Sequence, residues 1–156
     1  MVHTGHFGEV AGYPEGSTFS NRRELSQAGV HRPLQAGISG SGLAGADSIV
    51  LSGGYEDDED SGVEIIYTGQ GGNDPNTGRQ VADQTLARGN KALALSRDRG
   101  LPVRVIRGSG HSSSYSPLQG YRYDGLYLVE DCWNEIGRSG YKIYLQALGH
   151  GFCHAK

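Results

Sequence analysis

Glycine is the residue type that most constrains how this chain can fold. The sequence holds 26 glycines in 156 residues, about 17%, against roughly 7% in an average protein. Glycine weakens helices and suits tight turns, and here it follows no periodic repeat. We therefore expect many turns and short strands in a single domain, which at this length is large enough to bury a core.

Short apolar segments indicate where the strands lie. Each is bounded by glycine, serine or proline and is rich in Val, Ile, Leu and Tyr. Residues 141–147 alternate between apolar and polar side chains, the period of a half-buried strand, and the glycines at 137–140 suit a hairpin turn before it. The other predicted strands are 48–51, 63–68, 102–106 and 125–131.

The pattern changes between residues 80 and 99. Val81, Leu86, Leu93 and Leu95 are spaced among polar residues, which predicts one helix, or two short helices that meet near Gly89. The predicted fold class is therefore α+β and mostly β.

Residues 53–72 bring aromatic, acidic and glycine residues together. They read GGYEDDEDSGVEIIYTGQGG, with Tyr55 and Tyr67 on either side of the acidic run. Tyrosine rings stack on a planar ring, a carboxylate accepts a hydrogen bond from an amino group, and glycine lets the backbone come close. We interpret this stretch as a pocket for one planar base.

Several motifs of the chain resemble one family. GGYEDD at 53–58, YTG at 67–69 and YDG at 123–125 look like the SRA family, also called the YDG or SET-and-RING-associated domain. Residues 29–33, 36–38, 90–95 and 102–105 resemble it too, and the motifs keep the family's order over about residues 8–148. The resemblance implies a single domain over 1–156 with a strongly curved, barrel-like sheet of the SRA/PUA-like type and helices packed on one side.

The resemblance also implies a function. Members of this family read 5-methylcytosine in DNA by flipping the base out of the helix. Asp58 matches the position whose carboxylate accepts from the cytosine amino group, and the two tyrosines would stack on the flipped ring. The expected pocket residues are Ser52, Gly53, Gly54, Tyr55, Asp58, Tyr67 and Thr68.

Two loops are expected to fill the gap left by the flipped base. Gln35 would enter the minor groove, and Arg79 or Gln80, in the segment that begins at Gly78, would approach from the major groove. This segment lacks the Asn-Lys-Arg tip that reads the CpG context in the best-known members, so the resemblance does not by itself imply their preference for CpG or for hemimethylated DNA. The expected phosphate contacts are Arg22, Arg23, His31 and Arg32.

Charge and cysteine content set limits on partners and compartment. The net charge is −3 and the pI is about 6, whereas DNA-binding domains are often above 9, but five of the 17 acids lie together at 56–60. Without them 12 acids face 14 bases, which allows a basic face and modest, salt-sensitive binding. The two cysteines form no disulfide framework, and neither a signal peptide nor a membrane span is visible, so we expect a cytoplasmic protein.

Competing motifs are weaker. The GxGxxG match at 40–45 is followed by a strand-like segment instead of a helix, and the acidic run has Thr68 where a calcium loop needs glutamate. Cys132, His150, Cys153 and His154 fit no common zinc spacing. We expect no catalytic residue, no cofactor and no metal in this domain.

The resemblance leaves three hypotheses for the biological role of a domain that reads a modified base. A compact member of this kind suits a bacterial modification-dependent restriction enzyme, with an HNH-type nuclease module linked to or associated with the reader of 5-methylcytosine or 5-hydroxymethylcytosine. The alternatives are a chromatin-type adaptor that recruits a partner protein to methylated DNA, and a binder of another modified base, of RNA or of a small molecule.

Overall fold

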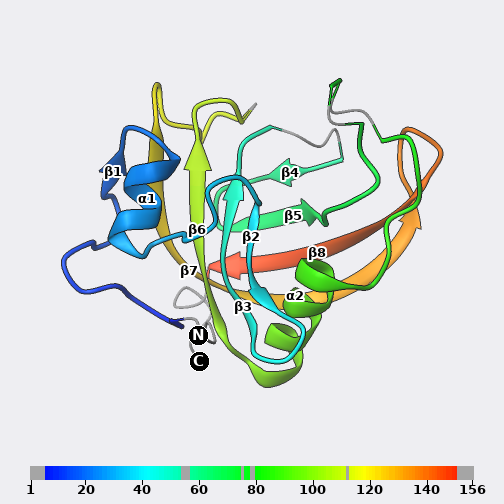
Figure 1. Ribbon diagram of the computed structural model, residues 1–156, viewed down its shortest axis with the longest axis horizontal. Coiled ribbons are helices and arrows are strands. Elements are labelled where there is room, and N and C mark those ends of the chain that lie inside the picture. The colour runs from blue at the N-terminus through cyan, green and yellow to red at the C-terminus, as the bar shows by residue number, and fades with distance from the viewer. Residues whose placement is uncertain (1–5, 54–56, 75, 78–79, 112, 151–156) are drawn as a thin grey trace.

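The computed structural model of the chain describes residues 6–53, 57–74, 76–77, 80–111 and 113–150, which form an eight-stranded sheet and two helices (Figure 1). The described elements are, in chain order, β1 (Thr18–Phe19), α1 (Arg22–Ala28), β2 (Ile38–Ser41), β3 (Gly45–Leu51), β4 (Glu59–Asp60), β5 (Glu64–Thr68), α2 (Arg88–Arg99), β6 (Pro102–Gly108), β7 (Tyr121–Ile136) and β8 (Lys142–His150). The mostly β composition is as predicted.

The sheet is open but strongly curved. Its strand order is β2-β3-β6-β7-β8-β5-β4, with β1 paired to β7, and among the described strand pairs only β3 and β6 run parallel. The curvature brings β5 near the opposite end of the sheet, where the Tyr67 hydroxyl lies 3.3 Å from the carbonyl oxygen of Gly37 and 3.4 Å from that of Val50. The prediction of a curved, barrel-like sheet is confirmed, without full closure of the barrel.

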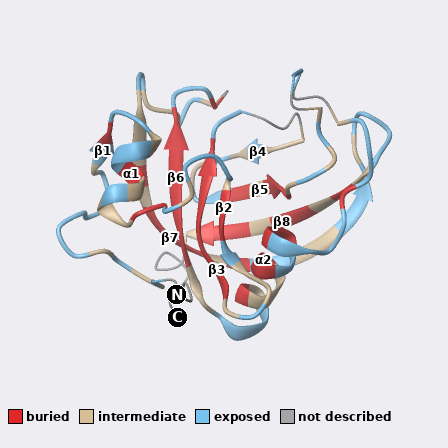
Figure 2. Cartoon of the chain, in the orientation of Figure 1, coloured by how far each residue is buried: buried red, intermediate tan, exposed pale blue. Residues whose placement is uncertain are grey.

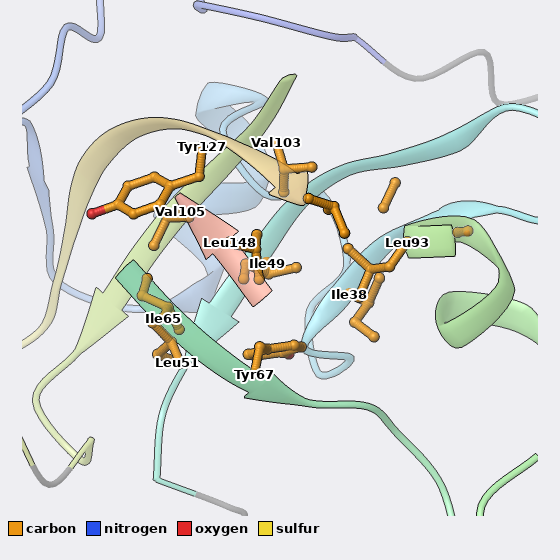
Figure 3. Close-up of a cluster of buried hydrophobic side chains, with 13 residues drawn as sticks. Ile38, Ile49, Leu51, Ile65, Tyr67, Leu93, Val103, Val105, Tyr127 and Leu148 are labelled. Carbon is orange, nitrogen blue, oxygen red and sulfur yellow. The ribbon is translucent and has the colours of Figure 1, made fainter. Parts of the chain in front are cut away.

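The main core fills the inside of this curve. Side chains from both ends of the sheet meet there, as Ile38 of β2 and Tyr67 of β5 show, and Leu93 of α2 packs against them (Figure 3). Strands β3 and β6 are buried along almost their whole length (Figure 2). The cluster consists of Ile38, Ala46, Ile49, Leu51, Ile65, Tyr67, Ala92, Leu93, Val103, Val105, Tyr127, Val129 and Leu148.

A second cluster lies on the other face of β3 and β6. Side chains alternate across a strand, so Ile49 and Leu51 face the main core while Val50 faces Leu25 of α1. The two helices therefore pack on opposite faces of the sheet, and the expectation that both lie on one side is wrong. The second cluster consists of Phe19, Leu25, Val30, Val50, Ile106 and Tyr123.

The predicted helix is shorter than expected. It begins at Arg88, because residues 80–87 use their polar groups to join distant strands instead of each other. Gln84 is buried, and its side chain donates to the Gly69 carbonyl oxygen at 2.7 Å and accepts from the Tyr144 N–H at 2.8 Å. Its backbone N–H bonds the carbonyl oxygen of Lys142 at 2.8 Å.

All five predicted strands occur and overlap β3, β5, β6, β7 and β8, although the predictions for β5 and β8 begin one residue early. The helix α1 and the short strands β1, β2 and β4 were not predicted. The GxGxxG match falls on the tight hairpin turn between β2 and β3, where residues Ser41 and Gly45 pair, so it is not a dinucleotide-binding motif. Among the described helices none is long and apolar enough to cross a membrane.

Candidate nucleic-acid interface

A cavity of about 450 Å³ opens where the curved sheet brings β5 near β3. It has the size of a small-ligand site. Its walls come from β3 and β5 and from the loops that precede β2, follow β3 and follow β5. The lining residues are Gln35, Ala36, Gly37, Val50, Ser52, Asp58, Tyr67, Gln70, Gly71 and Asn73.

Tyr67 supplies the aromatic wall. Its side chain is only 5% exposed, because one part of the ring belongs to the main core while the rest borders the cavity. The hydroxyl group donates to the carbonyl oxygens of Gly37 and Val50, which fixes the ring plane. The cavity wall therefore includes a firmly held aromatic side chain.

Asp58 supplies the acceptor. It precedes β4, and its Oδ1 accepts from the backbone N–H of Thr68 at 2.7 Å, which ties the acidic segment to the end of β5. Burial raises the pKa of Asp58 to about 6. A carboxylate has further lone pairs, so Asp58 can also accept from an amino group in the cavity.

The turn after β3 forms another wall. Ser52 lines the cavity and is exposed. Gly53 has φ +86°, and a Cβ there would lie 2.2 Å from the carbonyl oxygen of Gly110, so no larger residue fits without a shift of the backbone. Gly54 and Tyr55, expected to complete this wall, lie outside the described residues.

Gln35 lines the cavity and is exposed. Its loop is held by Arg22 of α1, which donates to the carbonyl oxygens of Pro33 at 2.8 Å, Ala36 at 2.6 Å and Gln35 at 3.3 Å. Burial lowers the pKa of the Arg22 guanidinium. Arg22 therefore shapes this loop, and its predicted contact with a phosphate stays a prediction.

His31 is wrongly predicted as a phosphate contact. Its side chain is fully buried, with Nδ1 2.6 Å from the Ser48 hydroxyl and Nε2 2.9 Å from the Ala36 carbonyl oxygen. Burial lowers the pKa of His31 to about 4, so the ring is neutral at pH 7. Arg23 and Arg32, in contrast, are exposed.

Of the predicted major-groove segment only Gln80 is described, since Gly78 and Arg79 lie outside the described residues. The Gln80 side chain donates to the carbonyl oxygens of Gly71 and Ala82, both at 2.9 Å. These hydrogen bonds stabilise the loop that contains Gln80, next to the cavity residue Gly71.

The wall that follows β5 was predicted only in part: Gln70 and Gly71 lie within the stretch 53–72 but were not among the named pocket residues, and Asn73 lies outside that stretch. Gln70, Gly71 and Asn73 line the cavity directly after the YTG motif at 67–69, and that adjacency was the available signal. The segment is held by Asn90 of α2, whose Oδ1 accepts from the Gln70 N–H at 2.8 Å and whose Nδ2 donates to the Gln70 carbonyl oxygen at 3.0 Å. Within the described ranges, no group of three or more His, Cys, Asp or Glu side chains is arranged to hold a metal ion.

Comparison with known proteins identifies the fold and the family. The chain is 42% identical to the E3 ubiquitin-protein ligase UHRF1 of Rattus norvegicus over 164 residues, 92% of this chain and 21% of that protein. The modification dependent TagI restriction endonuclease matches with a TM-score of 0.89 and 53% identity over 92% of this chain and 51% of that one. The SUVH5 SRA domain in complex with fully methylated CG DNA matches with a TM-score of 0.77 and 42% identity over 93% of both chains.

The chain thus spans about a fifth of the ubiquitin ligase and about half of the endonuclease. The sequence profile of the SAD/SRA domain matches residues 6–150, which include every strand and both helices of the described structure. This chain belongs to the SAD/SRA domain family.

Proposed function

We propose that this domain reads 5-methylcytosine or 5-hydroxymethylcytosine in double-stranded DNA by receiving the flipped base in the cavity beside Tyr67. The observation that carries the proposal is that the Asp58 carboxylate and the Tyr67 ring line the same cavity of about 450 Å³. A paired cytosine hides its amino group, so a protein that reads this group must first extrude the base.

The cavity offers matching chemistry for cytosine. Asp58 accepts from the exocyclic amino group, whereas the carbonyl of thymine at the same place would be repelled. Stacking on Tyr67 contributes about 1–3 kcal/mol, which offsets the few kcal/mol that flipping requires. Backbone groups at Ser52, Gly53 and Thr68 are proposed to complete the polar contacts, together with Gly54 and the second stacking ring of Tyr55.

The remaining contacts are proposed for the duplex. Gln35, at the rim of the cavity, fills the space that the flipped base leaves, and the segment 78–80 approaches from the major groove. Arg23 and Arg32 contact phosphates, which position the protein without reading sequence.

The domain is proposed to perform no bond-breaking step itself and to direct a linked or associated nuclease module, of the HNH type, to modified DNA. Its similarity to the TagI restriction endonuclease, at 53% identity over 92% of this chain, supports this proposal. The 42% identity to a ubiquitin ligase supports the second candidate, an adaptor that recruits a partner protein to methylated DNA. Cleavage of methylated plasmid by the intact protein in the presence of a divalent cation distinguishes the two.

The proposal is tested by fluorescence anisotropy at one salt concentration with matched duplexes that carry cytosine, 5-methylcytosine, 5-hydroxymethylcytosine or thymine at one site. A 2-aminopurine beside that site reports flipping by a rise in fluorescence. We expect tighter binding of the modified duplexes together with this rise, and a loss of cytosine selectivity in Asp58→Asn that exceeds its loss of nonspecific affinity. Equal binding of all four duplexes without a fluorescence rise would show that the domain does not read a flipped cytosine.

A further inference from the structure

One short segment, residues 107–111, touches both ends of the loop that carries the cavity residues Ser52 and Asp58. At the start of the loop, Leu51 of β3 pairs with Arg107 of β6 in the parallel ladder. At its end, the guanidinium of the same Arg107 holds Asp60 of β4, with 2.7 Å from Nη2 to Oδ1 and 2.7 Å from Nε to Oδ2.

His111 repeats this arrangement four residues later. Its Nε2 lies 2.9 Å from Oδ2 of Asp60, at the end of the loop. At the start of the loop, Gly53 packs so closely that an added Cβ would lie 2.2 Å from the Gly110 carbonyl oxygen and 3.4 Å from the His111 Cα. The loop is therefore fixed at both ends by neighbouring residues of one segment, which lowers the entropy that its ordering costs.

The contacts to Asp60 are buried. The exposed fractions of the side chains are 2% for Asp60, 4% for Arg107 and 5% for His111. Burial opposes ionisation of Asp60, but hydrogen bonds from His111 and Arg107 hold its pKa well below the usual range. A buried ion pair is weak evidence for net stability, and its best-attested role is to fix one structural register.

Register matters here because the acidic segment alternates between two environments. Asp57 and Glu59 line a groove beside Trp133, whereas Asp58 lines the base cavity and Asp60 faces Arg107. Successive side chains of an extended segment point to opposite sides, so a slip by one residue would exchange the two sets. Asp60 is thus placed to decide which of its neighbours enters the cavity.

We propose that Arg107 and His111 are positioning residues that hold Asp60 in one register and thereby keep the Asp58 carboxylate in the base cavity. The inference rests on the proposed function of the cavity and adds the part of the molecule that sets its specificity. Asp124 supports the arrangement from the other side, since its Oδ2 accepts from Nη1 of Arg107 at 2.9 Å.

Hydrogen exchange of the Thr68 amide measures the position of Asp58 without DNA, because this N–H donates to Asp58 Oδ1. The variants are His111→Ala, which removes the donor to Asp60, and His111→Gln, which keeps a donor at that position. Asp57→Asn is the matched control, because it changes a neighbouring acid that faces the groove. Binding of the 5-methylcytosine and cytosine duplexes is measured for each variant.

We expect His111→Ala to speed exchange of the Thr68 amide by about tenfold and to weaken binding of the methylated duplex by about threefold or more, because binding falls with the fraction of competent molecules. His111→Gln should restore both values toward wild type, and Asp57→Asn should leave both within about twofold of it.

The proposal is overturned if His111→Ala leaves Thr68 exchange and methylated-duplex binding at wild-type values. It is also overturned if exchange rises equally at Thr68 and at core amides such as that of Val105, because that result indicates general destabilisation. A wild-type protein without preference for the methylated duplex would refute the proposed function instead, while Thr68 exchange in His111→Ala would still decide whether His111 positions Asp58.

Discussion

Tyr67 serves the core and the cavity at once, and this double role affects how the site can be probed. The ring packs in the main core and its hydroxyl bonds two backbone carbonyls, while part of it lines the cavity. Truncation to alanine would remove a core side chain, which costs about 3–5 kcal/mol of stability for a large aromatic residue. Asp58, which lies outside the main core, is therefore the cleaner residue for testing base recognition.

The raised pKa of Asp58, about 6, predicts a pH dependence of binding. An ionised carboxylate is the stronger acceptor for the cytosine amino group, so affinity for the methylated duplex should rise as pH increases through 6 and level off above it. Anisotropy titrations between pH 5 and about 8 check this expectation. The rise should be absent in Asp58→Asn.

The raised pKa of Asp58 also affects the stability of the protein without DNA, and this effect has the opposite dependence on pH. Between the unfolded pKa of 3.8 and the folded value of about 6, the folded state holds more protons on Asp58 than the unfolded state does. The contribution of Asp58 to stability therefore decreases as pH rises through this window. Urea unfolding of wild type and Asp58→Asn at pH 4 and about pH 7 tests this. The free energy of unfolding of wild type should fall relative to that of the variant as pH increases. A difference between the two free energies that does not change with pH would contradict the assigned burial of Asp58.

Single residues were predictable where a motif fixes both residue type and spacing. Asp58 and Tyr67 were found in this way, and the structure places both on the cavity. His31 was misread because its basic neighbours Arg32 and Arg23 suggested a phosphate-binding surface, whereas the fold turns this one ring inward. The role of Asp60 could not be predicted from the sequence. Its neighbours do not show that it is buried, because its partner Arg107 belongs to another strand.

At the scale of elements, Arg22 connects α1 to the loop that carries Gln35. Its guanidinium group donates to three carbonyl oxygens, those of Pro33, Gln35 and Ala36. Arg22→Ala should loosen this loop and reduce the 2-aminopurine signal with the methylated duplex. Arg22→Lys should not restore it, because a single ammonium cannot reproduce a planar set of donors.

Arg23→Ala is the matched control for this prediction, because Arg23 is the exposed neighbour on the same helix. It should weaken binding without changing the amplitude of the 2-aminopurine signal at saturating protein. If Arg22→Ala instead reduces the salt dependence of binding and keeps the full signal, then Arg22 contacts phosphate and its loop-shaping role is secondary.

Element boundaries were predictable only where local pattern and tertiary contacts agree. The strands β3 and β6 are short and are buried along almost their whole length, and the predicted strands 48–51 and 102–106 lie within them. The helix was predicted from residue 80, but Gln84 is held by β5 and β8, so the helix begins at Arg88. The partner in β8 lies 60 residues away in sequence, outside any window that periodicity samples.

At the scale of the whole molecule, the acidic run at 56–60 should repel DNA less than its formal charge suggests. Asp60 pairs with Arg107, and Asp57 lies 3.8 Å from Arg138, while Asp58 is half-buried in the cavity wall. The described acids of this run are thus largely paired or buried. A chain of net charge −3 can therefore still present basic residues to a duplex near the cavity.

This distribution predicts a shallow salt dependence of binding. Each neutralised phosphate contributes about −0.9 to the slope of log K against log salt concentration, so contacts from Arg23 and Arg32 account for a slope of about −2. The double variant Arg23→Gln, Arg32→Gln should lower affinity equally for methylated and unmethylated duplexes and reduce the slope by about that amount, because phosphate contacts do not read bases.

Arg99→Gln removes the same charge at a distant place and is the control for global electrostatics. Arg99 donates to the Leu43 carbonyl oxygen at the hairpin turn that precedes β3, and β3 runs seven residues, about 20 Å, from that turn to the cavity. Its slope should stay at the wild-type value. The contrary result is that Arg99→Gln changes the slope by as much per removed charge as the double variant does. DNA would then be attracted by the net charge of the molecule, and not specifically by the exposed arginines near the cavity.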